Sequence, residues 1–149
     1  MIFVCAMTMA QTNAYPLLPM PQNYKVTDKS FAMGKVKLST PVLKSEWEAF
    51  IVNAGGELAD KAAAEIKVEL LPVIDGVKLN PDEAYRLSVS GKLIKIEAVT
   101  ERGVYWALQT LRQLEKKKGK KSLFAGCEIV DWPAFRIRGF MQDVGRSYI

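Results

Sequence analysis

The chain of 149 residues contains no histidine, only two cysteines and no long run of apolar residues. The lack of histidine excludes Ser-His-Asp and Cys-His nucleophile pairs, His-ligated zinc and an imidazole general base. A membrane-spanning helix needs about 20 predominantly apolar residues, which no segment supplies. Catalysis by this chain would therefore have to use carboxylates, lysine, tyrosine, serine or the substrate itself.

The composition that is present fits a folded domain with one local concentration of charge. Hydrophobic residues make up 49% of the chain and charged residues 25%, which does not fit a disordered chain. The net charge is +5, and residues 112–121 alone hold six basic residues against one glutamate, which is also a net charge of +5. The basic character therefore belongs to this short stretch, and the rest of the chain is neutral.

The lysine run between Lys116 and Lys121 has two interpretations. It could form a patch for nucleic acid or an anionic membrane, or it could be the solvated end of a helix and the loop that follows. Binding of single-stranded nucleic acid favours aromatic residues interleaved with the basic ones. None occurs between Arg112 and Lys121. We therefore expect a solvated face and no nucleic-acid partner.

Residues 1–14 are interpreted as a secretory leader, because residues 1–10 are apolar apart from Thr8. Small residues at Ala10 and Ala14 supply points where a signal peptidase could cleave. This interpretation predicts a secreted or periplasmic protein; the alternatives are a misassigned start and an N-terminal strand. Because Cys5 would leave with the leader, Cys127 would stand alone, and we expect it to be a small buried hydrophobe.

Hydrophobic periodicity predicts two helices among short strands. A capping-box pattern of Ser45 and Glu48 begins the first helix, which ends at Gly55. The second helix, over residues 103–117, has an apolar stripe on one face and carries the lysines at its C-terminal end. The order predicts an α+β fold in which an antiparallel sheet has two helices on one face. The expected strands, two of them joined as a hairpin by Ser90-Gly91, cover residues 24–27, 35–40, 66–71, 85–90, 94–98, 124–130 and a final run over 136–144.

Two groups of residues in the middle of the chain invite a functional interpretation. Tyr105 and Trp106, and separately Trp47, could stack on sugar rings, but aromatic residues on an amphipathic helix more often belong to the core or an interface. Asp82 and Glu83 are adjacent carboxylates, as acid–base catalysis would use. Adjacent residues at the start of a strand point to opposite faces, so a turn is the better interpretation.

Asp143 and Arg146 stand at the end of the last apolar run. An arginine can bind vicinal hydroxyls through two parallel N–H donors, which lysine cannot do as a rigid fork. An acid and an arginine at the C-terminal end of a mostly apolar strand therefore suit a polar binding site. A plain ion pair between the two residues explains the pattern equally well, and both interpretations stay open.

Three stretches of the sequence, in this order, carry a resemblance to a known family. The sequence resembles the beginning of a glycoside hydrolase of family 20, a β-N-acetylhexosaminidase, and a fourth short stretch, LPMPQ at residues 18–22, is similar to the usual opening of that family. The three stretches are EAYRL at residues 83–87, RGVYWALQTLRQL at residues 102–114 and DWPAFRIRGFMQDVGR at residues 131–146.

The resemblance implies a division of the chain into a domain and the start of another. Residues 15–132 would be the non-catalytic N-terminal domain, which packs against a catalytic barrel. Residues 133–149 would be the first strand of that (β/α)8 barrel, truncated before its other strands. Sites on such barrels lie at the C-terminal ends of strands. Family resemblance then assigns Arg146 to binding hydroxyls of a terminal N-acetylhexosamine, and Asp143 to supporting the pocket.

The resemblance also implies that the 149-residue chain has no hydrolase activity of its own. The chemistry of the family is substrate-assisted: the acetamido oxygen of the substrate attacks the anomeric carbon, and an adjacent Asp-Glu pair on a later barrel strand assists. No such pair follows Arg146. The implied partners are the missing barrel of the same polypeptide and, for that whole polypeptide, a glycan with N-acetylhexosamine; no cofactor, metal or membrane span is implied.

Two alternatives from other functional classes remain. The chain could be a freestanding carbohydrate-binding module that uses Trp47 or Trp106. It could also bind nucleic acid through the lysine run, in which case the complex should survive physiological salt.

Overall fold

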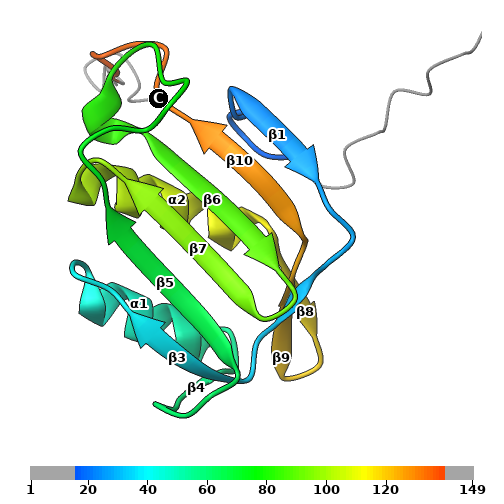
Figure 1. Ribbon diagram of the computed structural model, residues 1–149. Coiled ribbons are helices and arrows are strands. Elements are labelled where there is room, and N and C mark those ends of the chain that lie inside the picture. Colours follow the sequence, from blue (N-terminus) through cyan, green and yellow to red (C-terminus); the bar gives the residue numbers. More distant parts are fainter. Residues whose placement is uncertain (1–15, 140–149) are drawn as a thin grey trace, which may run out of the picture.

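A seven-stranded sheet with two α-helices on one face makes up most of the computed structural model, which describes residues 16–139 (Figure 1). The predicted leader, Asp143 and Arg146 lie outside the described residues. A second, three-stranded sheet lies at one end. The elements in chain order are β1 (Asn23–Val26), β2 (Phe31–Ala32), β3 (Lys35–Ser39), α1 (Lys44–Asn53), β4 (Glu57–Leu58), β5 (Ala64–Leu70), the 3-10 helix η1 (Pro81–Glu83), β6 (Tyr85–Ser90), β7 (Leu93–Ala98), α2 (Glu101–Gln113), β8 (Glu115–Lys118), β9 (Lys121–Phe124) and β10 (Cys127–Asp131).

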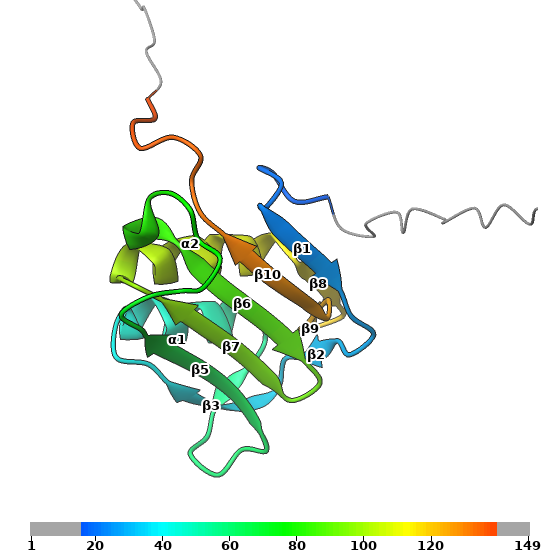
Figure 2. The same ribbon diagram turned by 45° about the horizontal axis from the view of Figure 1, so that its top comes forward.

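The large sheet is mixed, so the prediction of a wholly antiparallel sheet was wrong. Its strand order is β1-β10-β6-β7-β5-β3-β4. The pairs β1–β10, β10–β6 and β6–β7 are antiparallel, whereas the pairs β7–β5, β5–β3 and β3–β4 are parallel. Between β3 and β5 the chain returns across the sheet through α1, since parallel neighbours need such a crossover. Both helices cover the same face, as predicted (Figures 1 and 2).

The predicted hairpin and the apolar stripe of the second helix form the centre of the core. In the hairpin, Leu87 of β6 lies opposite Ile96 of β7, and Val89 lies opposite Ile94. Side chains on this face are buried and alternate with half-buried ones, which gives each strand the predicted apolar face. The helical residues that meet them, all fully buried, are Val104, Ala107, Leu108, Leu111 and Leu114.

The first helix forms where predicted but begins differently. It starts at Lys44 after Leu43, which has a left-handed backbone (φ 53°). The hydroxyl of Ser45 donates to the carboxylate of Glu46 at 2.8 Å instead of capping the helix, so the capping-box prediction was wrong. The helix ends as predicted, because Gly55 adopts a positive φ of 76° and a side chain there would overlap the carbonyl of Lys120.

The lysine run lies on a β-hairpin and not on a helix end, which corrects the second-helix boundary. α2 ends at Gln113, and β8 and β9 turn at Gly119, whose φ is 64°. Tertiary contacts favour strands over a longer helix, since β9 also pairs with β2. The Phe124 ring of β9 packs edge-on against the Phe31 ring of β2, with the ring centres 6.4 Å apart. Lys117 donates to the backbone oxygen of Asn53 at 2.9 Å and thereby fixes the hairpin to α1.

Candidate functional site at the exit of the chain

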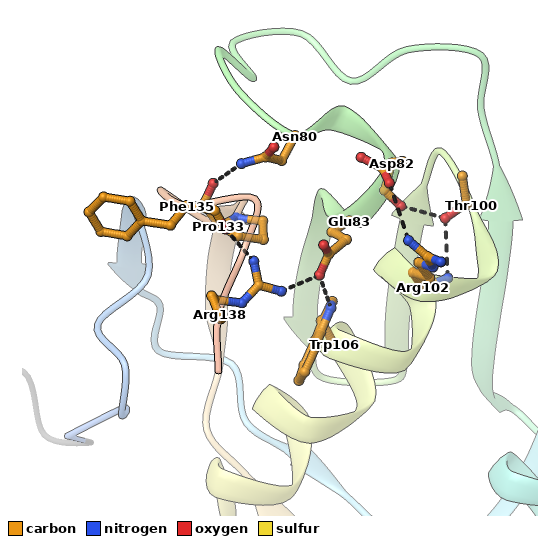
Figure 3. Close-up of polar contacts among 9 residues, drawn as sticks. All are labelled: Asn80, Asp82, Glu83, Thr100, Arg102, Trp106, Pro133, Phe135 and Arg138. Carbon is orange, nitrogen blue, oxygen red and sulfur yellow. Dashed lines mark hydrogen bonds and ion pairs between the residues drawn. The ribbon is translucent and has the colours of Figure 1, made fainter. Parts of the chain in front are cut away.

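The end of β10 and the segment that follows it run past η1 and the N-terminal half of α2 (Figures 2 and 3). This is the place where the described chain leaves the domain. Trp132, the last buried side chain among residues 16–139, packs with Ile74 and Ala84 in a small apolar cluster. Next to it lies an open hollow of about 730 Å3, lined by Leu43, Asp82, Glu83, Thr100, Glu101, Arg102, Tyr105 and Trp106.

Glu83, Trp106 and Arg138 form a polar group at this place, which we call the exit cluster. The indole Nε1 of Trp106 donates to Oε2 of Glu83 at 2.8 Å, and the guanidinium of Arg138 pairs with the same oxygen (Figure 3). The guanidinium carbon also lies 5.9 Å from the centre of the Trp106 ring, within the range of a cation–π contact. One carboxylate oxygen therefore joins η1, α2 and residues 132–139, the segment after β10 that we call the exit segment.

The charge of Glu83 is stabilised by these partners. Burial by itself would raise the pKa of this carboxyl. The hydrogen bonds from Arg138 and Trp106, with the positive charges of Arg138 and Arg102, outweigh burial and leave the pKa of Glu83 below its ordinary value. The carboxylate is thus ionised over the physiological range. It serves as an acceptor and carries no proton for acid catalysis.

Asn80 supplies a second contact to the exit segment. It has a left-handed backbone (φ 45°) just before Pro81, which begins η1. Its side-chain amide donates to the carbonyl of Pro133 at 2.7 Å. The turn predicted at Asp82 and Glu83 is confirmed as η1, and through Asn80 it contacts the exit segment directly.

The two adjacent carboxylates of η1 have different partners. Asp82 lies 3.6 Å from the guanidinium of Arg102, and its backbone carbonyl accepts a hydrogen bond from Thr100. Glu83 belongs to the exit cluster. Because the two carboxylates face different side chains, they do not flank a common bond, and the structure agrees with the turn interpretation of this pair.

A second polar group, which we call the buried cluster, consists of Tyr85, Thr110 and Asp131. The hydroxyls of Tyr85 and Thr110 share a hydrogen bond of 2.5 Å, and the Tyr85 hydroxyl donates to Oδ2 of Asp131 at 3.3 Å. Since a phenol has one proton, Thr110 is the donor to Tyr85. The other oxygen of Asp131 accepts from the backbone N–H of Gln22 at 3.1 Å.

Burial dominates the ionisation of the groups in and beside the buried cluster. It raises the pKa of Asp131, although hydrogen bonds from Gln22, Trp132 and Tyr85 act in the opposite direction. It also raises the pKa of Tyr85 above its usual value, and that of the neighbouring Cys127 thiol to about 12. Cys127 is fully buried, which confirms its prediction as a small hydrophobe.

Gly103 brings α2 close to the sheet, a role that the sequence interpretation missed. A methyl group at this position would overlap the carbonyl oxygen of Ala84 and lie 3.0 Å from the side chain of Ala98. The close approach places Trp106 beside Glu83. A glycine within an otherwise apolar helical stripe was the available signal. For Arg138 and Glu83 the only signal was membership of the stretches that carry the resemblance.

The structure separates the three aromatic candidates. Trp47 is fully buried beside Phe50, so it cannot stack on a ligand, and its assignment to the core is confirmed. Tyr105 and Trp106 lie on the outer face of α2, where they are 44% and 39% exposed. These two residues are therefore not part of the core, because the apolar stripe of α2 lies on the opposite side of the helix, and their assignment to an interface stays a prediction.

Residues 16–139 contain neither a cluster of metal ligands nor a membrane-spanning helix. In this part of the chain, no three Cys, Asp or Glu side chains lie together in a way that could hold a metal ion. Neither helix among the same residues has the length and apolar character needed to cross a membrane.

Comparisons with known proteins place this domain in a family. Residues 14–132 match the family model described as glycosyl hydrolase family 20, domain 2. A β-hexosaminidase of Vibrio furnissii is 35% identical over 89 residues, which are 60% of this chain and 14% of that protein.

Solved structures give the same result. The exo-β-N-acetylglucosaminidase of family 20 from Vibrio harveyi, solved in complex with N-acetylglucosamine, is 30% identical, with a TM-score of 0.64 over 85% of this chain. The chitobiase of Flavobacterium johnsoniae is 25% identical, with a TM-score of 0.59 over 89% of this chain. The chain spans only 20% and 23% of the lengths of these two proteins. With a family match that covers most of its length, this chain belongs to glycosyl hydrolase family 20 and carries domain 2 of that family.

Proposed function

We propose that residues 15–132 are the non-catalytic domain of a secreted β-N-acetylhexosaminidase, and that residues 133–149 begin its catalytic barrel. The observation that carries this proposal is that the polar residues in the stretches that resemble family 20 hydrogen-bond to other residues of this chain. Four of these residues form hydrogen bonds within the chain, namely Glu83, Tyr85, Asp131 and Arg138. A domain whose distinctive polar residues serve its own architecture supports a catalytic part and does not replace it.

The proposed reaction belongs to the whole polypeptide. In substrate-assisted hydrolysis the acetamido oxygen of the sugar attacks the anomeric carbon, the bond to the leaving oxygen breaks, and water later opens the cyclic intermediate. An Asp-Glu pair has to orient the acetamido group and protonate the leaving oxygen. The pair at Asp82-Glu83 cannot take this role, since Asp82 faces Arg102 and Glu83 is held ionised by Arg138.

Within the proposed barrel strand, Arg146 binds the sugar. Its planar guanidinium offers two parallel N–H donors, which match the spacing of neighbouring hydroxyls on a terminal N-acetylhexosamine. Asp143 supports the pocket around it. The bound N-acetylglucosamine in the Vibrio harveyi relative is consistent with this class of ligand.

The activity test uses a chromogenic N-acetylglucosaminide. The 149-residue chain should release no leaving group above the blank rate, because it lacks the assisting acid pair after Arg146. A polypeptide extended through a downstream Asp-Glu pair should release it, and Arg146→Lys in that polypeptide should raise KM more than it lowers kcat. Release of the leaving group by the 149-residue chain itself would contradict the accessory role.

A second candidate function is carbohydrate binding by the domain alone. It is favoured by the exposed pair of Tyr105 and Trp106, whose ring centres are 5.2 Å apart and which line the open hollow. Calorimetric titration of the chain with chitobiose distinguishes the accessory role from a carbohydrate-binding module. The accessory role predicts no saturable heat; a saturable heat that is lost in Tyr105→Ala would favour a binding module.

A further inference from the structure

Glu83 lies where the domain meets the segment that leaves it. We propose that Glu83 is a positioning residue: by holding Trp106 and Arg138 on one carboxylate oxygen, it sets the direction in which the chain leaves the domain. Only the consequence for a catalytic barrel rests on the proposed function, namely that the segment carrying Asp143 and Arg146 starts from a fixed direction. The positioning itself concerns residues 132–139 and can be measured on this chain.

Burial cannot hold the exit segment in place. Trp132 is its last buried side chain, and beyond it Phe135 is 73% exposed and Ile137 is 91% exposed. Side chains exposed to this degree gain almost nothing from contact with the domain. The path of the segment must therefore depend on its polar contacts.

Two polar contacts join the exit segment to the turn at η1. The first is the hydrogen bond from Asn80 to the carbonyl of Pro133. The second is the ion pair between Glu83 and Arg138, five residues further along. Two fixed points, one near each end of a short segment, determine its direction, whereas one point alone would leave it free to pivot. Figure 3 shows both contacts; along the chain, one precedes Phe135 and the other follows it.

Three features hold the contact between Glu83 and Arg138 in one geometry. The side chain of Glu83 is only 12% exposed, compared with 42% for that of Arg138, so solvent screens the pair less than an ordinary surface pair. The indole of Trp106 donates to the same oxygen and fixes the carboxylate. The other nitrogen of the Arg138 guanidinium donates to the carbonyl of Phe135 at 2.5 Å, so the arginine folds back onto its own segment.

The chain contains a natural control for this role. Asp82 is the neighbour of Glu83 in η1 and also pairs with an arginine, Arg102, at 3.6 Å. That pair is well exposed and does not touch the exit segment. A substitution at Asp82 removes the same charge from the same turn, so it tests whether the effect belongs to Glu83 and not to η1 in general.

The experiment measures the direction of the exit segment by the distance between two spin labels. One label is placed at Ile137→Cys and the other at Ala49→Cys, both exposed positions, in a Cys5→Ser background, since Cys127 is buried and does not react. The parent chain and Asp82→Asn should give one narrow distance distribution. Glu83→Gln and Arg138→Gln should each lose it and give a broad distribution. The double variant should be no broader than either single one.

A second readout reports on the contact itself. The indole proton of Trp106, identified by its loss in Trp106→Phe, should move upfield in Glu83→Gln and stay in place in Asp82→Asn. In each variant, the amide hydrogen exchange of β6 and β7 should match that of the parent, which shows that the domain is folded. If Glu83→Gln loses this protection, Arg138→Gln, which changes the exposed side of the pair, tests the positioning role in its place. A narrow distribution in Arg138→Gln, or broadening in Asp82→Asn, would overturn the positioning role. Because no substrate is involved, either result leaves the proposed hexosaminidase function to its own test.

Discussion

The buried cluster and the exit cluster connect the same three parts of the chain in two different environments. Each takes one residue from the beginning of β6 or the turn before it (Tyr85 or Glu83). Each takes one from α2, at positions 110 and 106, about one helical turn apart, and one from β10 or the segment after it, at positions 131 and 138. The first cluster lies inside the domain and the second at its edge.

The difference between the clusters teaches how one set of elements can serve both stability and orientation. Inside the domain, a polar group without a partner costs about 1–3 kcal/mol, so the buried cluster resists any arrangement that breaks it. At the edge, the side chain of Arg138 is 42% exposed, so water can replace its lost partner at a smaller cost. The exit cluster therefore contributes direction and little stability. Four measurements test whether the two clusters differ in this way.

The largest effect is expected from Gly103→Ala, because Gly103 allows the close approach on which both clusters depend. The added methyl group would overlap the carbonyl of Ala84, which is backbone and cannot rotate away. Moving α2 outward would stretch both the contact of Tyr85 with Thr110 and that of Glu83 with Trp106. We expect a loss of about 3 kcal/mol in the free energy of unfolding, measured with urea.

Gly91→Ala is the matched control for this substitution. Gly91 lies in the turn between β6 and β7, and a methyl group there would meet no atom within 4 Å. Its free energy of unfolding should stay close to that of the parent. An equal loss in both variants would mean that the contact with Ala84 does not explain the requirement for glycine.

The next effect is expected from Tyr85→Phe, which removes the central hydroxyl of the buried cluster. The buried Thr110 loses its acceptor, and the half-buried Asp131 loses a donor. We expect a loss of about 1–2 kcal/mol in the free energy of unfolding. Tyr105→Phe changes the same group on the outer face of α2 and should cost less than about 0.5 kcal/mol.

The contributions of Glu83 and Asp131 to the stability of the fold are expected to change with pH in opposite directions. The pKa of Glu83 is lowered, so its contribution to stability is present above the unfolded pKa of about 4.3 and is lost as pH falls through the folded value. The pKa of Asp131 is raised by burial, so the folded state loses stability as pH rises from about 3.9 toward the folded value.

Unfolding free energies of Glu83→Gln and Asp131→Asn between pH 3 and 6 test this contrast. The deficit of Glu83→Gln relative to the parent should grow as pH rises, because only the parent gains the charge that Arg138 stabilises. The difference between Asp131→Asn and the parent should move in favour of the variant over the same range. Parallel pH profiles for the two variants would show that the two clusters do not differ in burial as described.

The parts of the fold that repeat a simple pattern could be predicted from the sequence. The β6–β7 hairpin and the buried stripe of α2 follow from periods of two and of three to four residues. The parallel half of the sheet could not, since the pairing of β5 with β7 joins segments separated by a loop and another strand. The β8–β9 hairpin was missed because its five lysines gave no apolar alternation, and packing of Phe124 decided the outcome.

The exit cluster was beyond sequence reasoning for a different reason. Glu83, Trp106 and Arg138 lie 23 and 32 residues apart in steps along the chain, and no period or motif connects them. Only the close packing at Gly103 and the direction of the chain after Trp132 bring them together. The resemblance to family 20 identified the stretches that contain them but not their contact.

The smallest effect is expected from Asp82→Asn, which removes a charge pair next to both clusters but part of neither. The side chains of Asp82 and Arg102 are 55% and 74% exposed and 3.6 Å apart, so water and salt screen their attraction. The free energy of unfolding should change by at most about 0.5 kcal/mol, and less in high salt. If this variant instead lost as much stability as Tyr85→Phe, exposure would not be what separates the polar groups at this end of the domain. A small effect would mean that an ion pair on η1 gains structural importance only when, like that of Glu83, it is half-buried and shared with an aromatic donor.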